Sequence, residues 1–215
     1  MIVLFGGRRG WGIPEPIGRL FFLDQEYNVP TLYTSFLFVL CAFYCVRLGY
    51  NTYARKKPST LIWMLLGILL VFLSADEWFE IHEKLIVPLR TAFNIEQGLF
   101  YFAWTIAYVG LVIMVGLVTI PWFRKLEPRF RKRLALGAGI YITGALVFEI
   151  IGSWVYSTGG HQYSPAYANI VTIEESLELI GLTLATLILG RYRIRRIKVM
   201  PSQHEVPAAK KRKIV

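Results

Sequence analysis

The chain has 215 residues, 55% of them hydrophobic, and a formal net charge of +10. This hydrophobic content and five long apolar stretches exclude an ordinary soluble protein and indicate a multi-pass membrane protein. The positive charge does not indicate nucleic-acid binding, because 19 of the 24 Lys and Arg residues lie on one side of the apolar stretches and 5 on the other. Such an asymmetry orients a protein in its membrane. We therefore expect an inner-membrane protein with an outer N-terminus and a cytoplasmic C-terminus.

Residues 1–29 are rich in glycine, proline and aromatic side chains, a composition typical of an arm that lies in the outer membrane interface. At its end, Asn28 followed by Pro30 predicts the start of a helix, with the asparagine as cap. Arg19, Asp24 and Glu26 precede that start. We expect this arm to fold over the outer face as a lid, with Arg19 as a counter-charge.

Five apolar stretches predict an all-α, five-helix transmembrane bundle over residues 30–190, followed by a basic cytoplasmic tail at residues 191–215. The expected helices cover residues 31–50, 59–87, 99–123, 134–156 and 170–190. The third of them carries Tyr101, Trp104 and Tyr108, which we expect to face lipid or to pack against neighbouring helices.

The second expected helix has an unusual polar half. Only residues 61–73 are free of polar groups, which at 1.5 Å per residue cover about 20 Å of a hydrocarbon core roughly 30 Å thick. A helix that runs to the stop at Pro88 must therefore carry Asp76, Glu77 and Glu80 into the outer part of the bilayer. We expect neighbouring helices to shield these charges from lipid.

Nine of the fourteen carboxylates fall in or near the outer ends of the expected helices. Ionisable groups at membrane depth cost roughly 2.5–3.5 kcal/mol each and usually mark a site. Small residues beside the glutamates of the fourth and fifth helices predict close packing that turns them inward. Three helices should therefore share one acidic layer. Its expected members are Asp76, Glu77, His82, Glu83, Glu149, Glu175 and Glu178, with Glu80 and Glu174 as additional candidates.

Such a layer can be stabilised by protons, by paired Lys or Arg, or by a bound cation. Local pairing is poorly supplied, since only Lys84 and Arg90 lie nearby on the same side. Carboxylates with one imidazole form a donor set for a divalent or transition-metal ion such as Fe, Mn, Zn or Ca. Phe79 stands where a Glu-x-x-His di-iron motif would place glutamate, which weakens that particular assignment. Protonated or ion-paired carboxylates, and a face covered by a partner, remain alternatives.

Four short motifs resemble those of a group of uncharacterised bacterial polytopic membrane proteins with five helices. They are the LDxExNxPT pattern at residues 23–31, DExxxxHE at residues 76–83, Phe148-Glu149, and EExxExxG at residues 174–181. Glu80 is not part of this pattern. The resemblance implies that the acids belong together, and it implies no activity.

These observations predict an integral membrane protein with an outward-facing, cation-binding acidic cluster. A metal-dependent membrane enzyme is one interpretation, with no catalytic residue identified. An accessory subunit of a larger complex and a cation- or proton-coupled carrier are the alternatives. The expected partners are the lipid bilayer, other membrane subunits or a second copy of the chain.

Overall fold

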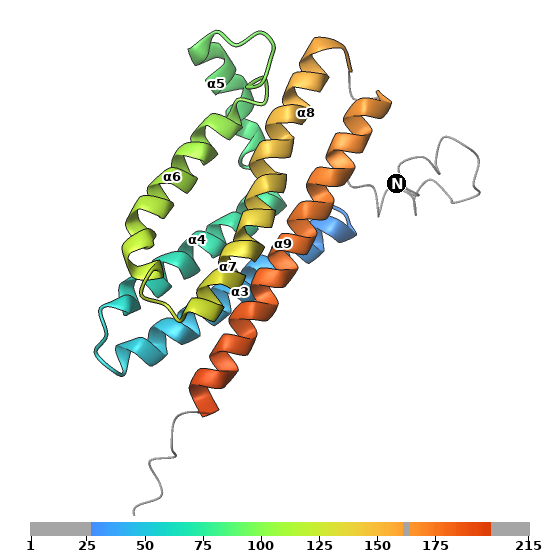
Figure 1. Ribbon diagram of the computed structural model, residues 1–215. Coiled ribbons are helices and arrows are strands. Elements are labelled where there is room, and N and C mark those ends of the chain that lie inside the picture. Colours follow the sequence, from blue (N-terminus) through green and yellow to red (C-terminus); the bar gives the residue numbers. More distant parts are fainter. Residues whose placement is uncertain (1–26, 161–163, 199–215) are drawn as a thin grey trace, which may run out of the picture.

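A computed structural model of the chain describes residues 27–160 and 164–198. Within these ranges the secondary structure is helical, with six helices joined by short connections and no strand. Four helical stretches are long and apolar enough to cross a membrane: Val29–Tyr53, Ser59–Phe79, Trp104–Phe123 and Pro128–Gly159. The protein is therefore a helical bundle with the character of a multi-pass membrane protein (Figure 1).

The first two helices, α3 (Val29–Tyr53) and α4 (Ser59–Phe79), form an antiparallel pair that packs along most of its length. The side chain of Asn28 accepts a hydrogen bond from the Thr31 amide at 2.9 Å, so the predicted cap and helix start are confirmed. Between the two helices, Ser74 donates to the Ser35 carbonyl at 2.9 Å. The apolar core of the bundle begins at this contact, around Phe38, Cys41, Cys45 and Trp63.

The predicted extent of the second helix, to residue 87, is wrong. α4 ends at Phe79, because Glu80 adopts a left-handed backbone conformation with φ of 51°. A short 3₁₀ turn (Glu83–Leu85) and a separate helix, α5 (Ile86–Phe93), follow. Pro88 lies in the first turn of α5, where proline does not break a helix, so it could not serve as the stop.

Helix α6 (Trp104–Phe123) lies at the edge of the bundle, and among its residues only Trp104 and Thr105 are buried (Figure 1). It begins later than residue 99, since the preceding turn is bound to another helix. The amide of Phe102 donates to the Ser153 hydroxyl at 2.8 Å, and the amide of Gly98 donates to the Ser157 hydroxyl at 2.9 Å. These contacts fix the start of α6 against the chain segment around Ser153.

The fourth helical stretch is continuous but changes its winding twice. It consists of α7 (Pro128–Ile142), a π-helical turn η2 (Thr143–Phe148), α8 (Glu149–Val155) and a second π-helical turn η3 (Tyr156–Gly160). It starts earlier than the expected residue 134, at Pro128, which suits the first position of a helix. π-helical turns are rare and occur frequently at functional sites.

The last helix, α9 (Pro165–Lys198), is longer at both ends than the expected span 170–190. It is not among the four stretches apolar enough to cross a membrane, and its charged residues include three glutamates at positions 174, 175 and 178. The total of five crossings therefore stays a prediction.

Helices α7 and α9 approach each other closely through glycines. A methyl group added to Gly181 would collide with the Tyr141 amide nitrogen, and one on Gly137 would lie 3.0 Å from the Ala185 amide nitrogen. Gly144 in η2 would meet the Glu174 carbonyl at 2.7 Å. Small residues thus let the backbones touch, as the sequence predicted for these two helices.

The helix directions define two ends of the bundle. At one end, called the acidic end, α3, α6 and α9 begin and α4 ends. At the other, called the basic end, lie the α3–α4 connection (residues 54–58) and the α6–α7 connection (residues 124–127). The expected lid residues Arg19, Asp24 and Glu26 and the tail beyond Lys198 lie outside the described residues.

Candidate cation site

A cavity of about 570 Å³ extends between α3, α4, α6, α7 and α9. Its walls are mostly apolar, and its polar groups are concentrated at the acidic end of the bundle. Eight of the nine residues expected in the acidic layer line this one cavity: Asp76, Glu77, His82, Glu83, Glu149, Glu174, Glu175 and Glu178. Three chain segments far apart in the sequence therefore bring their carboxylates to a common space.

Asp76 holds the chain in place where α4 ends. Its carboxylate accepts a hydrogen bond from the His82 amide at 2.7 Å and lies 3.4 Å from His82 Nδ1. Burial by itself lowers the pKa of His82, but the hydrogen bond to Asp76 and the charges of Asp76, Glu149 and Glu77 outweigh it and raise that pKa above its usual value. The imidazole is thus held toward its charged form by the acids that surround it.

Trp104 binds the acid of α8 directly. Its indole Nε1 donates to Glu149 Oε1 at 2.9 Å, and its ring lies 4.7 Å from the imidazole of His82 and 5.0 Å from the ring of Tyr108. Trp104 is only 7% exposed, and both it and Tyr108 line the cavity. Trp104 therefore packs against neighbouring residues, as one of the two expectations had it, and its hydrogen bond to Glu149 was not expected. Tyr101 instead lies under the guanidinium of Arg90, 3.7 Å from the ring centre.

Glu149 and Glu174 line the same end of the cavity, and the charge of Glu149 acts on the carboxyl group of Glu174. This proximity follows from local backbone features. Glu149 is the first residue after the π-helical turn η2. Gly144 within that turn allows α9 to approach closely, since a Cβ added to Gly144 would lie only 3.0 Å from Glu178 Cγ. A larger residue at Gly144 would separate the two helices and the carboxylates with them.

The remaining charged residues near this end lie outside the cavity lining. Glu80 forms the left-handed end of α4 and is not part of the lining. Lys84 Nζ donates to the Phe79 carbonyl at 2.7 Å, and Arg90 Nε donates to the Ile95 carbonyl at 3.3 Å. The two nearby bases identified in the sequence thus bind backbone carbonyls.

Comparison with protein families identifies the family of this chain. Residues 2–191 match the model of a family described as Domain of unknown function (DUF8692). The chain belongs to this family. Comparisons with curated proteins and with solved structures gave no match. Membership of the DUF8692 family agrees with the resemblance to an uncharacterised family noted from the motifs.

The description of the DUF8692 family names no activity, so the ligand has to be inferred from the donor chemistry of the site. Carboxylate oxygens with one imidazole suit a divalent or transition-metal ion in type. Among the described residues, however, no group of three or more His, Cys, Asp or Glu side chains converges closely enough to hold such an ion. The acids form a wall around the end of a large cavity rather than a tight set of ligands.

Proposed function

We propose that this protein is a multi-pass membrane protein whose cavity binds a cation at its acidic end. The observation that carries the proposal is the juxtaposition of Glu149 and Glu174 at the end of a cavity large enough for a ligand. Carboxylates that share one low-dielectric space favour a proton or a cation among them, because their like charges repel. The lining contains no Lys or Arg from the described residues, so the cavity favours a cationic ligand.

The orientation follows from the positive-inside asymmetry of the sequence. With 19 Lys and Arg residues on the side of the basic end, we infer that this end faces the cytoplasm. The acidic end then faces outward, and the cation enters from the extracytoplasmic side of the inner membrane. The apolar lining toward the basic end, which includes Leu134, Leu182 and Leu189, favours a binding site over a continuous ion path.

Two kinds of cation fit different features of the site. A metal ion fits the donor types, and its binding would draw the carboxylates of Glu149, Glu174 and Glu178 toward one another. An ammonium group on an apolar body fits the cavity without that rearrangement, since about 570 Å³ lies within the usual range of small-molecule pockets. A membrane enzyme acting on such a ligand and an accessory subunit that carries it both require this binding step.

The experiment compares the wild type with Glu149→Gln, which keeps the shape of the side chain and removes its charge. The matched control is Glu96→Gln, because Glu96 is exposed and does not line the cavity. Each protein is purified without chelator, its metal content is measured, and its melting temperature is recorded alone, with chelator, and with either decylamine or decanol.

If the ligand is a metal ion, chelator should lower both the metal content and the melting temperature of the wild type and of Glu96→Gln, since binding energy stabilises the folded state. Chelator should change neither quantity in Glu149→Gln. If the ligand is an ammonium compound, decylamine should raise the melting temperature more than decanol does in the wild type and in Glu96→Gln, but not in Glu149→Gln. If neither cation distinguishes Glu149→Gln from the control, the proposed cation site is rejected.

A further inference from the structure

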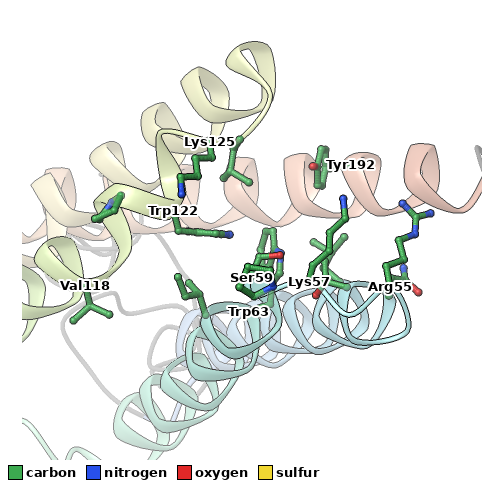
Figure 2. Close-up of a pocket in the computed structure, with 15 residues that line it drawn as sticks. Arg55, Lys57, Ser59, Trp63, Val118, Trp122, Lys125 and Tyr192 are labelled. Atoms are coloured by element: carbon green, nitrogen blue, oxygen red, sulfur yellow. The ribbon is translucent and has the colours of Figure 1, made fainter.

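A second cavity, also of about 570 Å³, lies at the basic end of the bundle, between the α3–α4 connection and the end of α6 (Figure 2). Three basic side chains line it: Arg55 and Lys57 from the α3–α4 connection, and Lys125 from the α6–α7 connection. Figure 2 shows them on two sides of the cavity, with Trp63 and Trp122 between. Among the described residues no carboxylate lines this space, in contrast to the first cavity.

These basic groups are available to a ligand. In the part of the chain that the structure describes, Arg55, Lys57 and Lys125 form no ion pair with an acidic side chain. Ser59, the first residue of α4, also lines the cavity, and the capping position before it provides no side-chain hydrogen bond. The positive end of the α4 helix dipole therefore adds to the field of the three side chains.

The floor of the cavity is aromatic and apolar. The indoles of Trp63 and Trp122 meet edge to face with their ring centres 4.8 Å apart, and both residues also line the first cavity, so the two spaces adjoin there. The apolar surface beside the cavity is open, since Leu61 on α4 is 65% exposed and Val118 on α6 is 56% exposed. Membrane proteins have this arrangement where they meet the membrane–water interface, with basic side chains beside tryptophans and exposed apolar helix surface.

We propose that this cavity binds the phosphate headgroup of an anionic phospholipid from the leaflet at the basic end. Arg55, Lys57 and Lys125 bind the phosphate from two sides, and the acyl chains lie on the apolar surface of α4 and α6. Basic pockets between membrane helices bind acidic headgroups in this way. A lipid fits better than a soluble phosphate compound, because the apolar floor and the flanking apolar helix faces match acyl chains. This inference does not depend on the cation site.

The test uses the full chain in nanodiscs or mild detergent and measures the binding of phosphatidylglycerol, with phosphatidylcholine as the uncharged reference and inorganic phosphate as the soluble probe. The variant replaces the three lining bases, Arg55→Gln, Lys57→Gln and Lys125→Gln. The matched control replaces three exposed bases of the same end that do not line the cavity, Lys56→Gln, Arg124→Gln and Arg129→Gln. Both triple variants lose the same charge.

The lining variant should bind phosphatidylglycerol about 100-fold more weakly than the wild type, since each basic group that contacts the phosphate directly contributes roughly a fivefold factor or more. The control should stay within about fivefold, and inorganic phosphate at millimolar concentration should neither stabilise the protein nor displace the lipid. The single variant Lys125→Gln should show a partial loss, which checks the result if the triple variant does not fold. Equal losses in both triple variants, or equal protection by free phosphate, would overturn the proposal. Glu149→Gln should leave lipid binding unchanged.

Discussion

At the scale of single residues, the acidic cavity depends on polar side chains that hold one another. The carboxylate of Asp76 binds the backbone amide and the imidazole of His82, and Glu149 binds the indole of Trp104. The His82 ring lies against Trp104, so these contacts connect α4 to α6 and α8. The order of this end of the bundle therefore depends on a few donors and acceptors, each of which can be removed separately.

Replacing Trp104 with Phe should destabilise the protein by about 1–3 kcal/mol, because the Glu149 carboxylate loses a hydrogen-bond donor in a partly buried position. The control is Trp154→Phe, since Trp154 is 50% exposed and should be nearly neutral. Thermal unfolding in detergent measures both. Similar melting temperatures for the two variants would show that the indole–carboxylate bond contributes little.

At the scale of elements, glycines and π-helical turns bring the acids together. α7 and α9 touch through their backbones at Gly137 and Gly181, and η2 brings Gly144 against the Glu174 carbonyl. Close packing of small residues takes the place of a hydrophobic driving force between helices in lipid. The cavity persists beside this contact because α6, at the edge of the bundle, does not fill the space.

Gly181→Ala should destabilise the protein by roughly 1–3 kcal/mol or more, because its new methyl group would collide with the backbone of α7 at Tyr141. Gly110→Ala on α6 is the matched control, since nothing lies within 4 Å of its added methyl group. The control should be neutral or stabilising by up to about 1 kcal/mol, the helix-propensity difference between the two residues. Melting curves of both variants test this, and an unaffected Gly181→Ala would contradict the close approach.

Much of this arrangement could be predicted from the sequence, because hydropathy and charge report directly on burial in a membrane. The apolar stretches predicted the long helices, the small residues predicted the close packing of two of them, and the expected acidic layer, except for Glu80, corresponds to the cavity lining. The end of α4 could not be predicted in this way, since it depends on a left-handed Glu80 and on Asp76 binding a residue six positions later. The role of Trp104 was also missed, because its hydrogen bond joins segments 45 residues apart.

At the scale of the whole molecule, the charged groups of the two adjoining cavities have opposite sign and lie at opposite ends of the bundle. Carboxylates line one, Arg55, Lys57 and Lys125 line the other, and the Trp63–Trp122 pair lies between them. A bundle with this polarity should insert in a single orientation.

A reporter placed at residue 160 should be extracytoplasmic, and reporters at residues 128 and 205 should be cytoplasmic, because the Lys and Arg residues cluster on the latter side. Paired reporters that are active only inside or only outside the cell can establish each position. The opposite pattern would place the acidic end in the cytoplasm and would contradict the inferred outward-facing site.

The separation of charge between the two cavities also has an electrical consequence. In the inferred orientation, the carboxylates face the positive side of an energised membrane and the basic side chains face its negative side, so the membrane potential favours both placements. A cation that enters the acidic end from outside moves part of the way through this potential, and a full crossing corresponds to about 2.3 kcal/mol per charge for each 100 mV. Its binding should therefore tighten as the potential rises, which proteoliposomes with an imposed potassium diffusion potential can measure. The affinity of the acidic cavity would then depend on the energetic state of the cell.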